Sequence, residues 1–209
     1  MAYSFLDIAM TSGVRAAQTA MGSAELWNAR KGRSFDQFTR DEFDFIAERD
    51  SFYMATVSET GWPYIQHRGG PRGFLKAIDQ RTLAFADYRG NRQYISVGNL
   101  STDDCVCLFL IDYPRRARLK IYAHAEIVSL DADPVFTQQV IRPEYKAKPE
   151  RIIRLHVDAF DWNCPQHITP RFTEQEITEA IQPLRDRLVH LETENAKLRA
   201  QLNHLGDRP

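Results

Sequence analysis

Three side chains that could contact an anionic ligand lie together in the middle of the chain. Gln66, His67 and Arg68 end a segment that is predicted to be a strand, and they offer an amide, an imidazole and a guanidinium group. Gly69 follows them and, because it has no Cβ, lets a ligand approach the backbone closely. This combination predicts a polar, cationic strand end at which a small anionic molecule could bind.

A second polar segment follows the next predicted strand. Asn91 and Arg92, preceded by Arg89, lie at a turn that is predicted to lead into a helix over residues 92–97. Arginine makes bidentate contacts with phosphate, and the first backbone N–H groups of a helix have no partner within it. The segment therefore predicts a phosphate site, and the alternative is a loop whose charges are only solvated.

The distribution of charge favours the same part of the chain. The 209 residues carry a net charge of −1, which argues against a protein that coats nucleic acid. Residues 61–122 nevertheless contain ten basic and five acidic side chains.

No apolar run is long enough for a membrane helix, and the N-terminus lacks the basic start of a secretory signal. With only three cysteines, the chain is expected to be a soluble cytoplasmic protein without nucleic-acid or membrane partners.

The pattern of apolar residues places both segments in a β-rich domain. Short runs of β-branched and aromatic residues between turn residues predict strands over residues 52–57, 62–68, 82–88, 105–111, 118–128 and 152–160. Helical spacing and capping residues predict helices over residues 11–21, 39–50 and 133–141. About six strands with few helices between them indicate a mainly β fold with flanking helices, built as an antiparallel β-barrel.

The C-terminal segment has a different period, with apolar residues at alternating spacings of four and three. These residues are Ile177, Ile181, Leu184, Leu188, Leu191, Leu198 and Leu202. They fill heptad positions a and d, together with Asn195 at one a position, which favours a parallel two-stranded coiled coil. Arg187 and Glu194 then lie opposite Glu192 and Arg199 across the interface. The alternative is an amphipathic helix that packs on its own domain.

The changes of pattern divide the chain into three predicted parts. Residues 1–37 form a helical or irregular extension, residues 38–170 form the β-barrel domain, and residues 171–209 form the coiled coil. Pro183 falls on the outer side of the coil and is predicted to mark the start of its continuous part.

Two cysteine-containing spacings bear on metal binding. Cys105-x-Cys107 and Cys164-x-x-His167 each place two ligand side chains close together, but neither has the second Cys-x-x-Cys pair of a typical zinc site. Cys105 and Cys107 lie among Val, Leu and Phe and are predicted to be core residues. The sequence therefore predicts no metal site.

The order of these features resembles the pyridoxamine 5′-phosphate oxidase-like, FMN-binding split-barrel family over residues 38–130. The similar features are a helix, a hairpin with Gly61-x-Pro63 at its turn, and a Phe85-x-x-Tyr88 strand that leads into a polar, basic turn. Residues 161–167 are similar to a segment in one uncharacterised branch of that family. The resemblance implies a split antiparallel β-barrel, FMN as the cofactor, and a homodimer with FMN in a groove between the two subunits.

The resemblance also implies roles for individual residues. Gln66, His67 and Arg68 would lie along the ribityl chain and ring edge of FMN, and Asn91 and Arg92 would bind its phosphate. The residues that would flank this site or face the flavin ring are Gly69, Asp87, Tyr88, Gln93, Trp162, Gln166 and His167. For Trp162 and His167 the alternative is a packed structural loop.

One further cationic candidate comes from strand alternation. Arg116, Arg118 and Lys120 would share one face of a strand, where Arg116 could stabilise the negative charge of a reduced flavin. The alternative is the solvated face of an outer strand.

The true oxidase ends in a Trp-containing strand and an Arg-Leu-x-Pro type terminus that holds its substrate. In this chain, residues 162–167 and the heptad segment stand where the oxidase has that C-terminal segment. Oxidation of pyridoxamine phosphate is therefore not expected. The predicted function is an FMN-dependent oxidoreductase that acts on a small organic substrate, with no acid or base residue identified. The alternatives are a non-catalytic flavin-binding or redox-sensing protein, and a split barrel that uses haem or a deazaflavin.

Overall fold

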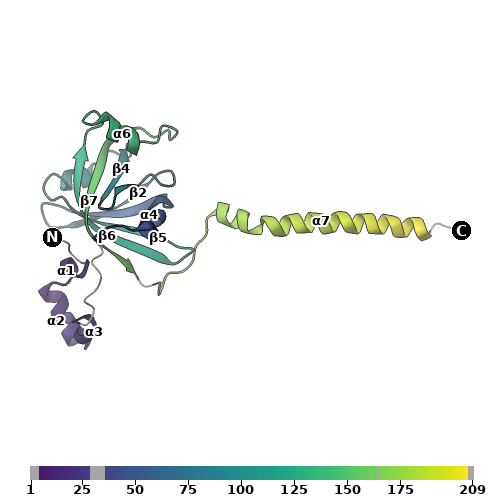
Figure 1. Ribbon diagram of the computed structural model, residues 1–209, viewed down its shortest axis with the longest axis horizontal. Helices are drawn as coiled ribbons and strands as arrows, with labels where there is room; N and C mark the ends of the chain where they lie inside the picture. The colour runs from purple at the N-terminus through teal and green to yellow at the C-terminus, as the bar shows by residue number, and fades with distance from the viewer. Residues whose placement is uncertain (1–4, 29–35, 164, 207–209) are drawn as a thin grey trace. The chain divides into compact units, whose positions relative to one another are not determined.

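The computed structural model describes residues 5–28, 36–163 and 165–206, without the side chains of Asn28, Asn163, His204 and Leu205. The chain divides into two compact units, which Figure 1 shows as ribbons. The first comprises Met1–Asp112 and Arg116–His167, and the second comprises Tyr113–Arg115 and Ile168–Pro209. The first unit holds the sheet, and the second holds one long helix.

The described residues of the first unit form one seven-stranded sheet. The strands are β1 (Ser51–Val57), β2 (Pro63–Gly69), β3 (Lys76–Asp79), β4 (Thr82–Tyr88), β5 (Cys105–Asp112), β6 (Ala117–Val128) and β7 (Pro149–Asn163). All neighbours pair antiparallel, in the order β2-β1-β5-β6-β7-β4-β3. Six of these strands are predicted by the sequence, and β3 is missed because it has only four residues.

The sheet curls so that strands near its opposite edges come together. Phe52 of β1 packs edge-on against Phe85 of β4 with 5.2 Å between ring centroids, although three strands lie between β1 and β4 in the sheet order. Inside the curl, Met54, Leu108 and Leu119 are fully buried in one core cluster. The expected split antiparallel barrel is therefore confirmed, and β2 and β4 lie close together where the barrel closes.

Strand alternation in β5 corrects the prediction for the two cysteines. Val106, Leu108 and Leu110 are buried in the barrel core. Cys105 is exposed and Cys107 is half-buried on the other face of the strand. The prediction that they are core residues is wrong, because a run that is apolar on both faces does not show which face points inward.

Short helices flank the sheet. They are α1 (Phe5–Ala9), α2 (Ser12–Ala20), α3 (Ala24–Asn28), α4 (Arg40–Ala47), α5 (Ile95–Asn99) and α6 (Pro134–Val140). The capping box of α4 is present, because the Glu42 carboxylate accepts from the backbone N–H of Thr39 at 2.7 Å. Helix α6 covers the outer face of β4, where Phe136 and Val140 pack with Ala84 in a second, smaller core cluster.

The second unit contains α7 (Glu174–Gly206), which Figure 1 shows as a single helix. It begins at a capping box in which Glu176 accepts from the backbone N–H of Thr173 at 2.7 Å. The helix continues through Pro183. Where a coiled coil would start along it stays a prediction, because the structure holds a single chain. Most apolar residues of its heptads are exposed, Leu184 at 70%.

No helix in the described part of the chain combines the length and apolar character that a membrane crossing requires.

Candidate functional site

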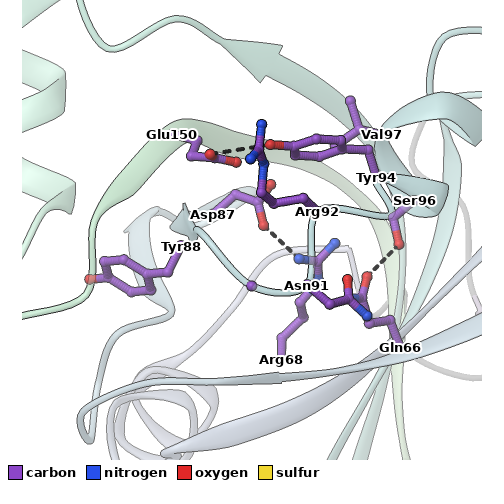
Figure 2. Close-up of a pocket in the computed structure, with 11 residues that line it drawn as sticks. Gln66, Arg68, Asp87, Tyr88, Asn91, Arg92, Tyr94, Ser96, Val97 and Glu150 are labelled. Atoms are coloured by element: carbon purple, nitrogen blue, oxygen red, sulfur yellow. Dashed lines mark hydrogen bonds and ion pairs between the residues drawn. The ribbon is translucent and has the colours of Figure 1, made fainter.

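A small polar pocket lies where β2, β4, the loop after β4 and the start of β7 come together (Figure 2). Its volume is about 50 Å³. The residues that line it are Gln66, Arg68, Asp87, Tyr88, Gly90, Asn91, Arg92, Tyr94, Ser96, Val97 and Glu150. The two polar segments that the sequence singles out therefore meet in one place, although a predicted strand separates them along the chain.

Alternation along β2 decides which residues of the first segment reach the pocket. Gln66 and Arg68 are half-buried and line it. His67 points to the other face, where it is exposed and packs edge-on against Tyr53 with ring centroids 5.5 Å apart. The side chains of Gln66, His67 and Arg68 therefore do not share one surface in this chain, because successive strand residues face opposite sides.

Arg68 is a buried cation that is paired with a buried carboxylate. Its Nη1 donates to Oδ1 of Asp87 at 2.5 Å, and Arg151 donates to the other Asp87 oxygen at 3.2 Å. Burial lowers the pKa of Arg68, while the adjacent Asp87 carboxylate raises it. An arginine remains charged even so, and the pair keeps a fixed positive group at the floor of the pocket.

One nitrogen of Arg68 has no hydrogen-bond partner among the described residues. Its Nε is buried and unsatisfied, although the guanidinium also lies over the ring of Phe85, 5.8 Å from the centroid. Leaving a buried charged donor unpaired costs about 1–3 kcal/mol. The Nη atoms of the same guanidinium lie on the pocket side of Arg68, where Asp87 pairs with one of them.

The loop after β4 has a backbone shape that the sequence did not predict. Arg92 and Tyr94 adopt positive φ angles of 63° and 53°, which a helix does not allow. The predicted helix over residues 92–97 is thus wrong at its start, and α5 begins only at Ile95. Asn91 shapes the turn, because its side-chain oxygen accepts from the backbone N–H of Gln93 at 3.1 Å.

Glu150 anchors this loop from the start of β7. Arg89 donates to the Glu150 carboxylate at 2.7 Å, and the Tyr94 hydroxyl donates to it at 3.2 Å. The hydrogen bond from Arg89 is the main cause that lowers the pKa of Glu150. A hydrogen bond to Tyr94 also raises the pKa of Arg92. Glu150 thereby ties Arg89 and Tyr94 to β7, and the exposed Arg92 between them lines the pocket.

The opposite wall of the pocket is held by a second polar contact. Ser96, which is buried in α5, donates to the amide oxygen of Gln66 at 2.9 Å. This bond fixes the orientation of the Gln66 amide and connects α5 to β2. Ser96 thus belongs to the pocket, although no motif in the sequence singles it out.

The other predicted site residues lie elsewhere or beside the pocket. Gly69 ends β2, and Gln93 is exposed and bonded to Asn91. Arg116 is exposed in the turn before β6 with φ 54°, so it does not share a strand face with Arg118 and Lys120. Gln166 and His167 are exposed after the end of β7.

Trp162 is placed in a packed environment. Its indole N–H donates to the Glu42 carboxylate at 2.6 Å, and its ring packs edge-on against Phe45 at 4.7 Å. Both partners belong to α4, so within this chain Trp162 joins β7 to that helix. Cys164, the other candidate ligand in this segment, lies outside the described residues.

Sequence reasoning missed the residues that the far end of the chain contributes. Glu150 and Arg151 lie more than fifty residues after the predicted segments, and the pairing of β4 with β7 brings Asp87 opposite Arg151. Their position next to the predicted strand over residues 152–160 is the one feature of the sequence that could have marked Glu150 and Arg151 as candidates. Only the strand register shows which partner that strand meets.

The charged groups around the pocket are two carboxylates and four guanidiniums: Asp87, Glu150, Arg68, Arg89, Arg92 and Arg151. The excess of positive charge suits an anion. A volume of about 50 Å³ is far below the roughly 300–1,000 Å³ of a complete ligand pocket. The pocket can therefore hold a phosphate-sized group and not a whole cofactor.

Comparison with solved structures finds several similar chains. The chain is similar to solved structures of a putative pyridoxamine 5′-phosphate oxidase from Lactobacillus delbrueckii (16% identity, TM-score 0.47, 60% of this chain and 94% of that one). It is also similar to an FMN-binding protein from Syntrophomonas wolfei (15% identity, TM-score 0.42, 74% of this chain and 97% of that one). A third similar structure is the haem storage protein HutZ from Vibrio cholerae (16% identity, TM-score 0.40, 60% of this chain and 94% of that one). No curated protein matches the chain.

The sequence profile that describes pyridoxamine 5′-phosphate oxidase matches residues 38–161, which is more than half of the chain. The match covers β1 to β6 and most of β7, and it includes every residue that lines the pocket. The chain therefore belongs to the pyridoxamine 5′-phosphate oxidase family.

Proposed function

We propose that this protein is an FMN-dependent oxidoreductase and that its pocket binds the phosphate of FMN. The observation that carries the proposal is the guanidinium of Arg68, which lines the pocket and is held there by Asp87. Arg92 at the rim and Asn91 in the turn add the polar groups that a phosphate needs. The family to which the chain belongs agrees with this chemistry.

Each residue of the pocket has a distinct task in this proposal. Arg68 is held by Asp87 and donates from the floor, while Arg92 is held by Tyr94 and supplies charge at the rim. Gln66 presents an amide whose orientation Ser96 fixes. Bound FMN would supply hydride or electron transfer at its ring, and the chain would bind and orient it.

The small volume of the pocket supports a homodimer. About 50 Å³ accommodates a phosphate group, so the remainder of FMN would lie outside the pocket of one chain. We propose that a second copy covers it and that the helices α7 of the two copies pair as a parallel coiled coil. The exposed leucines of α7 and the opposite charges of Arg187 and Glu192 support this pairing.

A flavin titration of the purified full-length protein tests the phosphate site. Arg92→Ala should weaken FMN binding roughly tenfold or more in Kd, because it removes a charge-assisted hydrogen bond. Arg40→Ala is the matched control, since Arg40 is an exposed arginine of α4 that pairs with Asp44 outside the pocket. Equal affinity of wild type and Arg92→Ala would refute the assignment.

Spectroscopy and turnover separate the alternatives. A flavin spectrum of the isolated protein supports FMN, whereas a Soret band would show haem and a deazaflavin spectrum would show that cofactor instead. Reduction of the bound flavin by NAD(P)H and reoxidation by an added acceptor support an oxidoreductase. A flavin that binds but does not turn over would assign a non-catalytic or redox-sensing role.

A further inference from the structure

A cluster of metal-ligating side chains lies on the face of β5 and β6 that points away from the barrel core. The strand register pairs Cys105 with His124, and Asp104 directly precedes Cys105. His124 Nδ1 lies 2.9 Å from Oδ1 of Asp104 and 4.0 Å from Sγ of Cys105. The three ligand atoms all lie within 4.8 Å of one another, and all three residues are exposed.

These separations are close to those of a tetrahedral zinc site. Zinc bond lengths of about 2.3 Å to sulfur and 2.0–2.2 Å to nitrogen or oxygen place neighbouring S and N ligands about 3.6 Å apart and N and O ligands about 3.4 Å apart. The observed 4.0 Å and 2.9 Å differ from these values by about half an ångström or less. Rotation of exposed side chains can supply such a change without moving the strands.

A fourth residue occupies the place of a supporting carboxylate. His124 Nε2 lies 3.2 Å from Oδ2 of Asp158, so the ring nitrogen that faces away from Asp104 and Cys105 has its own acceptor. A histidine that binds metal through one nitrogen usually donates its other N–H to a carboxylate in this way. Asp158 reaches this position because the register between β6 and β7 shifts at Tyr122 and Ala123, which leaves Asp158 as the extra residue of a bulge.

The cluster opens onto a hollow that is larger than the polar pocket. The hollow has a volume of about 260 Å³ and is lined by Cys105, His124, Asp158, Tyr122 and Ile8 of α1, among others. Three protein ligands leave one of four tetrahedral positions for water or another ligand, as in zinc sites that are not closed. The hollow gives that position access from solvent.

We propose that Asp104, Cys105 and His124 bind a zinc-class divalent cation, that Asp158 positions His124, and that the fourth coordination position accepts an exogenous ligand. A thiolate and an imidazole together favour Zn²⁺ over Mg²⁺ or Ca²⁺, which bind oxygen ligands. The site uses none of the residues of the polar pocket and is independent of the proposed flavin function.

Cobalt titration of the full-length, chelator-treated protein tests the site. Co²⁺ should bind with one equivalent per chain and give the thiolate-to-metal charge-transfer absorption that Zn²⁺ does not show, and Zn²⁺ should abolish that absorption by displacement. Absence of stoichiometric binding, or binding without this absorption, would overturn the proposal. The readout does not require flavin, so it can fail or succeed independently of the pocket.

Single substitutions test which residues bind and support the metal. Cys105→Ser should remove the charge-transfer absorption, while Cys107→Ser is the matched control because Cys107 lies two residues along the same face of β5. Asp158→Asn should weaken Co²⁺ binding by about 10- to 100-fold with the absorption retained. Retention of the absorption in Cys105→Ser, its loss in Cys107→Ser, or unchanged affinity in Asp158→Asn would overturn the corresponding assignment.

Discussion

Arg68 carries its charge at the mouth of a barrel, where only 12% of its side chain is exposed. Such a charge is tolerated when a partner compensates for the lost water, and Asp87 does so at 2.5 Å. Arg151 binds the second oxygen of Asp87, which keeps the carboxylate in place between two guanidiniums. The charged side chains of the pocket therefore form an ion-pair network in which Asp87 lies between Arg68 and Arg151.

Removal of Asp87 should therefore destabilise the protein strongly. Asp87→Ala leaves Arg68 buried beside Arg151 without a counter-charge, and breaking a buried pair in this way costs about 3–5 kcal/mol. The free energy of unfolding from urea denaturation measures the loss.

Asp44→Ala is the control for this prediction. Asp44 pairs with Arg40 one turn away on α4, and both side chains are mostly exposed. Its removal should cost about 0.5 kcal/mol or less. Similar losses for the two variants would show that the Arg68–Asp87 pair contributes no more than a surface ion pair.

Among the elements, α4 and β7 are joined through a single carboxylate. Glu42 closes the capping box of α4 by accepting from Thr39, and it also accepts from the indole N–H of Trp162 in β7. Burial alone would raise the pKa of Glu42, but the hydrogen bonds from Thr39 and Trp162 outweigh it and leave the pKa lowered from 4.5. The helix start and the end of β7 therefore depend on the same ionised group.

The shift predicts acid sensitivity with a defined sign. Because the folded pKa lies below the unfolded value, ionised Glu42 stabilises the folded state above pH 4.5, and this contribution is lost as the pH falls through the folded pKa. Glu42→Gln should reduce stability at pH 7 and lose less on acidification than wild type. Urea midpoints followed by tryptophan fluorescence at pH 7 and in the acidic range test this, and identical acid losses would contradict it.

Particular elements show what the sequence can and cannot predict. β4 is predicted with its observed bounds because Thr82–Tyr88 is a short β-prone run between turn residues. The contents of the pocket are predicted only in part, because strand alternation separates His67 from Gln66 and Arg68, and strand pairing adds Glu150. The side of the sheet to which a residue points, and the partner that a strand pairs with, depend on contacts between distant segments. A local sequence pattern does not contain that information.

For the whole molecule, the proposed homodimer depends on pairing between two copies of α7. The heptad leucines of α7 are exposed in the single chain, and a second copy of α7 offers a matching surface. Leu191→Lys places a charge at a d position and should shift a dimer toward monomer in sedimentation or light-scattering measurements. Leu191 is 43% exposed in the single chain, so the folding of one chain should be little affected.

Val189→Lys is the control for the coiled coil. Val189 is 62% exposed and falls at an outward b position of the same heptads, so the mass of the assembly should not change. If Leu191→Lys also leaves the dimer intact, the barrel unit carries the association and the coiled-coil proposal fails.

The most direct test of the central claim compares FMN with riboflavin, which lacks the phosphate. If the pocket of Arg68, Asn91 and Arg92 binds that phosphate, the full-length protein should bind FMN at least about 100-fold more tightly than riboflavin, since more than one charge-assisted hydrogen bond is lost. Arg92→Ala should reduce this preference by about tenfold or more while riboflavin affinity stays the same. Equal affinity of the wild-type protein for FMN and riboflavin would contradict the account.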